Sequence, residues 1–546
     1  MSMDLPRIEV LDPSNAPSLT GPSNNDAAIV FYSDKSSLTK IAPFTQSYFD
    51  LDAQFGESLQ LLVQDNTRVL IAPLGSLRSD VDDVRRFKDA AFAAGQRALK
   101  AGIRKPWISF ADPPTDTRLG WLHQNDQDEY VHFAEVTLLG LLEAAYEPID
   151  AREHAERVGK PLPVFDQLTL SVGLASAEQT TLIERVVAIE TGRRVAKDIG
   201  SPDPERMCPG RIVDYLNTVF KDDSSVKMTV IDDVDAIQRA YPLAHAVTRA
   251  SLKVPRHHPR FVHFEYQSPD QSKVKENLYF VGKGVTYDTG GADIKCSGHM
   301  RGMSRDKCGA AAVAGFIKTL SMLKPESVNV HAGLALVRNS VGSDSYVSDE
   351  VIYSRNGTRV LVGNTDAEGR MVMTDLLCEF KERAVAHLAS SEPSAKAPHF
   401  LFTVATLTGH ALRAYDGYAI AMDNGFARKH KMSQRIHDAG HVLADPFEIS
   451  TFRREDIEVV QPGRACEDVV QANDKASTMT NRGHQYPAGF MLIASGLDKH
   501  TLGDAQPLGY THLDVAGSAE TMSAVGWSLT RTTGSPVPAL AGAFLL

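Results

Sequence analysis

The sequence predicts an α/β protein of two domains, each with a mixed or mostly parallel sheet flanked by helices, joined by a long helix. Short apolar runs typical of buried strands alternate along the chain with longer helical patterns. One uninterrupted helical pattern runs from Gln179 to Ile199. The length of 546 residues exceeds one ordinary domain, so two are expected.

The first domain is expected over residues 26–178. The preceding residues 1–25 are rich in Pro, Ser, Asn and Asp, which predicts a partly disordered lead-in. The expected strands are 28–32, 69–72 and 107–110, and the expected helices are 80–100, capped by Asp80, and 132–146. This region shows no cluster of reactive residues, so we expect it to serve packing and assembly.

The second domain is expected over residues 205–546, after a linking helix and turn at 179–204. Glycine and two prolines at 200–204 end that helix. The expected strands, which are separated by helices, are 228–231, 261–264, 278–281, 328–337, 400–405 and 510–513. The Ser-, Ala- and Pro-rich segment 390–398 is expected to be a surface insertion.

Charged residues follow two of the apolar runs in the second domain. The run 278–282 leads into a glycine-rich segment with Lys283 and Asp288, and Lys295 and Asp306 come shortly after it. Charged groups between buried elements must be paired or must bind a ligand. We therefore expect this segment to form part of a functional site.

The second cluster, Asn364-Thr365-Asp366-Ala367-Glu368-Gly369-Arg370, follows the apolar run 360–362. A strand ending there would place these side chains at the carboxyl edge of a sheet, where α/β proteins bind ligands. Together the clusters hold two lysines, four carboxylates and one arginine. Such oxygen-rich sites suit divalent ions, and bridging carboxylates favour a two-metal hydrolytic centre. A lysine there can be a neutral metal ligand or a cation that stabilises an oxyanion.

Both clusters resemble those of the leucyl aminopeptidase (cytosol aminopeptidase) family of two-metal exopeptidases. The family pattern G-K-G-x-T-[FY]-D-[ST]-G-G-x-x-x-K matches residues 282–295, and an aspartate follows eleven residues later at Asp306. The motif N-T-D-A-E-G-R at 364–370 matches without change. The resemblance covers roughly residues 180–546 and implies a hydrolase that removes the N-terminal residue from peptides.

The resemblance also implies the ligands of two divalent ions, Zn²⁺ first and Mn²⁺ or Co²⁺ as alternatives. Asp288 and Glu368 would bridge the ions, Asp366 would complete the looser site, and Lys283 and Asp306 would complete the tighter one. The substrate's free α-amine would bind one ion, which would restrict cleavage to the N-terminus. A homohexamer of two trimers with internal active sites is implied as well.

By the same resemblance, Lys295 would stabilise the oxyanion formed from the scissile carbonyl. Arg370 would hold a bicarbonate ion or waters that accept a proton from the metal-bridging water. A pocket suited to Leu- or Met-like side chains would be lined by Met303, Thr406, Leu407, Gly409, Ala516 and Ala519.

Five positions depart from the family pattern, and one of them is Ser304, where the family more often has a basic residue. Thr289 replaces the commoner serine and keeps its hydroxyl, whereas Arg305 and Lys307 add positive charge beside Asp306. His410 stands where a small residue is usual. We assign none of them a catalytic role, although metal affinity and substrate preference could differ because of them.

Composition narrows the setting in which the protein acts. A net charge of −11 argues against nucleic acid or an anionic membrane as partner. The five cysteines are odd in number and form no C-x-x-C pair, so we expect no disulfide framework. The N-terminus lacks the apolar core of a secretory signal and the Arg-rich character of a transit peptide, so we expect a cytoplasmic protein.

Three alternatives stay open. The chain could be a binding or assembly protein that keeps the fold without the chemistry, although all seven charged positions are intact. It could be a dipeptidase narrowed to substrates such as Cys-Gly, which a substrate panel would separate. A dinucleotide enzyme is disfavoured because the full G-x-G-x-x-G spacing is absent around residues 282–284.

Overall fold

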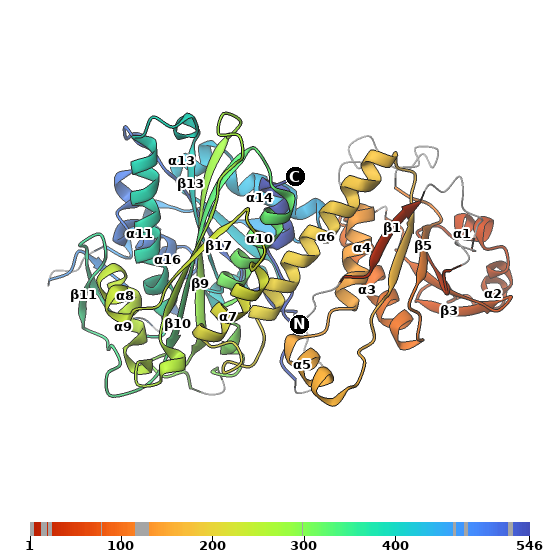
Figure 1. Cartoon of the computed structure of the whole chain (residues 1–546), viewed down its shortest axis with the longest axis horizontal. Helices are drawn as coiled ribbons and strands as arrows, with labels where there is room; N and C mark the ends of the chain where they lie inside the picture. Colours follow the sequence, from red (N-terminus) through yellow and green to blue (C-terminus); the bar gives the residue numbers. More distant parts are fainter. Residues whose placement is uncertain are drawn as a thin grey trace. The chain divides into compact units, whose positions relative to one another are not determined.

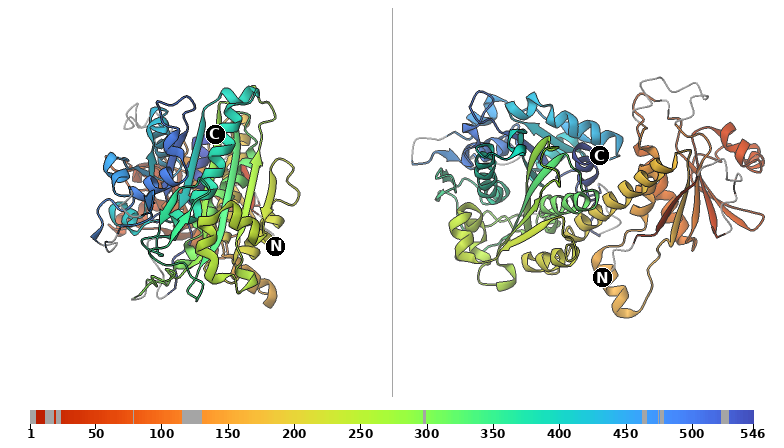
Figure 2. Two further views of the ribbon diagram at one scale, coloured as in Figure 1. Left: turned by 90° about the vertical axis from the view of Figure 1, so that its left-hand side faces the viewer. Right: turned by 45° about the horizontal axis from the view of Figure 1, so that its top comes forward.

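The computed structural model of the chain describes residues 5–11, 19, 24–77, 79–114, 130–296, 299–461, 466–473, 475, 479–521 and 528–546. Two compact units divide the chain, residues 1–191 with 441–445 and residues 192–440 with 446–546. The division after residue 191 falls within helix α6 (Ser176–Ile199), the long helix expected from the sequence. Each unit has its own sheet with helices (Figures 1 and 2), so the predicted fold class is confirmed.

The first unit is built on a six-stranded sheet in the order β1-β6-β5-β2-β4-β3. The strands are β1 (Arg7–Leu11), β2 (Ala27–Tyr32), β3 (Gln60–Gln64), β4 (Thr67–Pro73), β5 (Pro106–Phe110) and β6 (Gln167–Ser171). The helices are α1 (Lys35–Ile41), α2 (Thr45–Leu51), α3 (Arg85–Lys100), α4 (Phe133–Ala144) and α5 (Ile149–Val158). Neighbouring strands are parallel except β3 and β4. The continuous apolar strand β2 is buried along its length, as expected in a parallel sheet.

Two details of the first unit differ from expectation. Strand β1 lies inside the segment expected to be a lead-in, because it pairs along its length with β6; most of that lead-in lies outside the described residues. Helix α3 begins at Arg85, and its N-cap is Val84, so the prediction of Asp80 as the cap is wrong. The Asp83 carboxylate accepts a hydrogen bond from Arg85 N at 2.9 Å, which forms a turn before the helix begins.

The second unit is built on an eight-stranded mixed sheet in the order β15-β14-β17-β13-β9-β10-β8-β7. The strands are β7 (Lys227–Ile231), β8 (Arg260–Tyr266), β9 (Glu276–Asp288), β10 (Val328–Asn339), β13 (His399–Ala405), β14 (Ala419–Asp423), β15 (Phe447–Ile449) and β17 (Gly509–Asp514). The central strands β17, β13, β9 and β10 are parallel to one another. Their carboxyl ends therefore meet at one edge of the sheet.

Helices cover both faces of this central sheet (Figure 1). The helices of the unit are α7 (Pro209–Val219), α8 (Val234–Ala240), α9 (Pro242–Thr248), α10 (Cys308–Leu323), α11 (Glu368–Leu388), α12 (Gly409–Tyr415), α13 (Gly425–Lys429), α14 (Met432–Val442), α15 (Arg454–Glu458), α16 (Tyr486–Ala494) and α17 (Val537–Phe544). Along β9, Tyr279 packs toward Phe380 of α11, whereas Phe280 packs toward Phe316 of α10 and Phe544 of α17. This alternation explains why the strand is apolar on both faces. Among the described residues, no helix has the length and apolar character needed to cross a bilayer.

Two expectations for the second unit need correction. The apolar run 360–362 does not end a strand of the main sheet, because β12 (Arg359–Leu361) pairs with β11 (Val351–Tyr353) and β16 (Val469–Val470) in a separate small sheet. The segment 390–398 is not wholly superficial. Ser394 and Ala395 are buried, and Ser394 O accepts a hydrogen bond from Asn277 Nδ2 at 2.9 Å.

Candidate metal centre and active site

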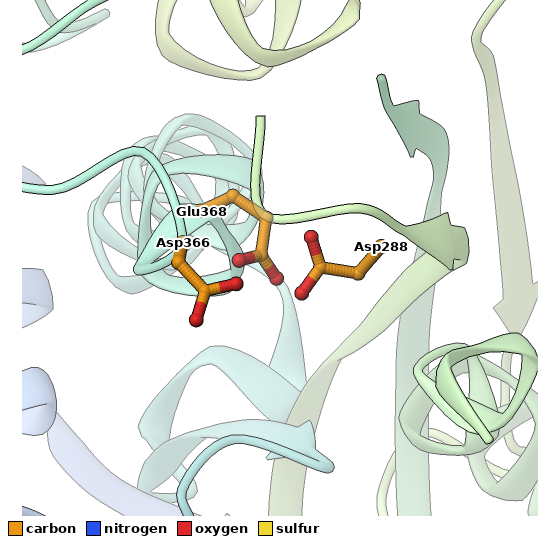
Figure 3. Close-up of side chains that lie close together, drawn as sticks. All are labelled: Asp288, Asp366 and Glu368. Atoms are coloured by element: carbon orange, nitrogen blue, oxygen red, sulfur yellow. The ribbon is translucent and has the colours of Figure 1, made fainter. Parts of the chain in front are cut away.

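Three carboxylates converge at the carboxyl end of β9. Asp288 is the last residue of that strand, Asp366 lies in the loop after β12, and Glu368 is the first residue of α11. Oxygen atoms from the three side chains lie within 4.8 Å of one another. Figure 3 shows Asp288 on one segment facing Asp366 and Glu368, which come from a second segment. The site therefore lies at the sheet edge where α/β proteins bind ligands.

Lys283 is the buried cation of this centre. Its Nζ lies 2.7 Å from Asp306 Oδ1 and 2.8 Å from Glu368 Oε1. Burial opposes its charge, but the surrounding carboxylates outweigh that effect and raise the pKa of Lys283. A Cβ at position 369 would lie 2.4 Å from Lys283 Cε, so Gly369 is required for this close approach.

Lys295 is the second lysine of the centre. Its Nζ lies 2.8 Å from Asp288 Oδ2 and forms a second ion pair with Asp366. Although burial opposes its charge, the neighbouring carboxylates raise the pKa of Lys295, so the side chain is a cation. The turn before it contains Gly290 and Gly291 at φ of 89° and 66°, which strongly favours glycine.

The centre carries more carboxylates than lysines. Burial and mutual repulsion raise the pKa values of Asp288, Asp306 and Asp366, whereas Lys283 and Lys295 outweigh burial at Glu368 and lower its pKa. Among the described residues, the buried Asp306 Oδ2 has no hydrogen-bond partner. A buried carboxylate oxygen in this state is stabilised by a proton or a cation. The donor set therefore fits divalent metal ions.

Arg370 lies beside the centre in the first turn of α11. Its Nη1 donates to Gln471 O at 2.7 Å, and its guanidinium lies 5.6 Å from the ring centroid of Tyr486. Burial lowers the pKa of Arg370 to about 10. Among the described residues, its buried Nε has no hydrogen-bond partner. This donor is available to an anion or a water molecule.

A cavity of about 370 Å³ connects these groups. Its walls include the seven charged residues Lys283, Asp288, Lys295, Asp306, Asp366, Glu368 and Arg370, and the expected pocket residues Met303, Thr406, Leu407, Gly409 and Ala516. Ala519 does not line the cavity, contrary to expectation. It is only 2 % exposed, because hydrogen bonds with Val515 and Thr533 hold its backbone inside the fold. Its neighbour Glu520 lines the cavity instead.

The basic residues beside Asp306 are bound to backbone carbonyls. Arg305 donates to Gly200 O at 2.8 Å, and Lys307, which is fully buried, donates to Ser201 O at 2.9 Å. Both side chains therefore anchor the segment 200–201. Arg305 also lines the cavity, as does His410.

The sequence patterns did not single out the residues that hold these carboxylates in place. Asn339 Nδ2 donates to Asp288 Oδ1 at 2.8 Å and to Thr365 O at 3.2 Å, and Tyr346 Oη donates to Thr365 O at 2.7 Å. A signal was present for Asn339, because it is a polar residue at the carboxyl end of a strand next to β9. Nothing in the local sequence marks Tyr346.

Two of the histidines, His257 and His484, have polar partners, and the cysteines are unpaired. All five cysteines are free, with Cys296 and Cys466 exposed and the others buried. His257 pairs with Glu205 at 2.9 Å, and His484 lies 2.9 Å from Ser450 Oγ.

Comparison with known proteins agrees with this geometry. Residues 194–541 match the model of the catalytic domain of the cytosol aminopeptidase family. The chain is 36% identical over 486 residues to "Putative aminopeptidase W07G4.4" of Caenorhabditis elegans, covering 88% of this chain and 87% of the relative. It is 26% identical over 503 residues to "Probable cytosol aminopeptidase" of Alkalilimnicola ehrlichii, covering 90% and 88%.

A solved structure shares the fold. The bottromycin maturation enzyme BotP, in a structure described as a complex with Mn, superimposes with a TM-score of 0.72 at 18% identity, covering 95% of this chain and 98% of that one. The family match extends over more than half of the chain and includes all seven charged residues of the cavity. The chain therefore belongs to the cytosol aminopeptidase family, and it is a metal-dependent aminopeptidase.

Proposed function

We propose that the protein removes the N-terminal residue from peptides, with a preference for Leu- or Met-like residues, using two divalent ions per subunit. The convergence of four carboxylates and two lysines on one cavity carries this proposal. Bound divalent ions would polarise the scissile carbonyl and lower the pKa of a water molecule. Zn²⁺ is the ion we expect, and Mn²⁺ or Co²⁺ could replace it.

Two cationic side chains would have separate tasks. Lys295 lies at the edge of the carboxylate cluster, where its charge would stabilise the oxyanion that develops on the substrate. Arg370 has an unpartnered Nε among the described residues, which would hold bicarbonate or ordered water close to the reacting groups. Such an anion or water would accept the proton released by the nucleophile.

The preference for the N-terminus predicts a sharp difference between free and blocked peptides. The substrate's free α-amine would bind one of the metal ions through its nitrogen lone pair, and acetylation delocalises that lone pair into an amide. N-acetyl-Leu peptides should therefore resist cleavage at concentrations where Leu peptides are hydrolysed rapidly. We would measure both with a panel of aminoacyl reporters and Cys-Gly. Comparable rates for free and acetylated peptides would contradict exopeptidase action, and turnover confined to Cys-Gly would indicate the dipeptidase.

We also propose a cytoplasmic homohexamer of two trimers, with peptides as substrates and no nucleic-acid partner. The family resemblance supports the assembly, and the N-terminal unit would contribute to it. Light scattering at micromolar concentration should give six times the chain mass of 59.5 kDa. A mass equal to that of one chain would exclude the hexamer.

A further inference from the structure

Asp293 lies beside the centre, and the proposed mechanism gives it no task. Asp293 lies two residues before Lys295, and its Oδ2 accepts hydrogen bonds from Thr365 N at 2.7 Å and from Ser348 Oγ at 3.3 Å. In return, Thr365 Oγ1 accepts a hydrogen bond from Asp293 N at 2.8 Å. Asp293 and Thr365 are thus joined by two short hydrogen bonds in opposite directions.

These bonds connect the two loops that carry the active groups. One loop runs from the end of β9 to Lys295, and the other carries Asp366 directly after Thr365. A further bond ties them, because Thr365 Oγ1 donates to Gly290 O at 2.6 Å. Any separation of the loops would move Lys295 away from Asp366, with which it forms an ion pair.

Thr365 is held firmly on its other side. It is fully buried, and its carbonyl oxygen accepts hydrogen bonds from Tyr346 Oη and Asn339 Nδ2. Asn339 Nδ2 also contacts Asp288 Oδ1 at 2.8 Å, so one buried network positions two of the carboxylates. Asp293 is exposed and supplies the contact from the solvent side. The Asp293 carboxylate therefore adds a second attachment of the Lys295 loop to an already fixed Thr365, beside the bonds made by the backbone of Gly290 and Asp293.

We propose that Asp293 is a positioning residue. It would clamp the loop that carries Lys295 against the loop that carries Asp366, and so maintain the geometry of the looser metal site, which Asp366 would complete. The inference rests on the proposed two-metal centre. Groups that orient metal ligands from outside the coordination shell typically change metal affinity by about 10–100-fold. Loss of the clamp should therefore weaken one of the two sites and leave the site of Lys283 and Asp306 intact.

The test uses three variants of the full chain. Asp293→Ala removes the acceptor, whereas Asp293→Asn keeps an oxygen that can accept from Thr365 N. Asp504→Ala is a matched control, because Asp504 also bonds the backbone N and hydroxyl of a threonine, Thr501, but in a surface turn outside the cavity. Metal-free enzyme would be titrated with Mn²⁺, with free and bound ion separated by electron paramagnetic resonance.

Wild-type protein and Asp504→Ala should each bind two Mn²⁺ per subunit, and the affinity of each site should be the same in both proteins. Asp293→Ala should bind one ion normally and the second ion about tenfold or more weakly. At saturating Mn²⁺ the kcat of this variant should fall, and its KM should change less. Asp293→Asn should restore the second site. Equal affinities in wild type and Asp293→Ala, or an Asn variant as weak as the Ala variant, would overturn the clamp. Wild-type protein that binds no Mn²⁺ would overturn the two-metal centre as well.

Discussion

Replacing Lys295 by alanine should lower kcat by about 10²–10³-fold, the typical cost of removing one oxyanion-stabilising donor. The Lys295 Nζ lies beside the carboxylates of Asp288 and Asp366, and its expected task is to stabilise charge that develops only in the transition state. An interaction of that kind affects kcat far more than KM. The variant should therefore bind a substrate-like inhibitor nearly as well as the wild-type enzyme does.

The bound metal of this variant separates catalysis from metal binding. Lys295→Ala should retain both ions in elemental analysis, since Lys295 is not among the expected ligands. Glu368→Ala is the matched comparison, because loss of an expected metal ligand should lower metal occupancy and rate together. Near-normal kcat in Lys295→Ala would remove this residue from the mechanism.

Exhaustive chelation should abolish peptidase activity, and added Zn²⁺, Mn²⁺ or Co²⁺ should restore it.

In the metal-free protein the carboxylates raise the pKa of Lys283, so this amine carries a proton. Binding a metal through the free amine must release that proton, and metal affinity should therefore fall as the pH falls. The rate should be greatest above neutral pH. A maximum near pH 5 would contradict the role of Lys283 as a ligand.

Much of the fold was predictable because its strands are strongly apolar. The run 278–281 marks β9, and the residues after it identify the edge of the sheet where Asp288 lies. Strand β1 was not recognised, because the charged residues Arg7 and Glu9 alternate with its apolar residues and its partner β6 is distant in the sequence. The apolar run 360–362 indicated a strand, but local sequence does not encode which sheet the strand joins.

The candidate site shows the same division between local and long-range information. The seven charged residues follow fixed spacings, so the sequence alone grouped the seven residues that line one cavity in the fold. The positioning groups Asn339 and Tyr346 do not follow such spacings. They lie next to Thr365 in the folded chain, where β10 is paired with β9. Lys307 is a charged residue whose environment the sequence did not predict. Its charge was expected near the metals, yet the folded chain directs its Nζ to the carbonyl of Ser201.

The number of bound ions at which activity saturates tests the two-metal centre most directly. Metal-free enzyme would be titrated with Zn²⁺ while bound metal is measured by elemental analysis and the hydrolysis of a Leu reporter is followed in parallel. Two ions per subunit at full activity, with no activity before metal is added, is the predicted result. Full activity in protein that contains no metal would contradict it.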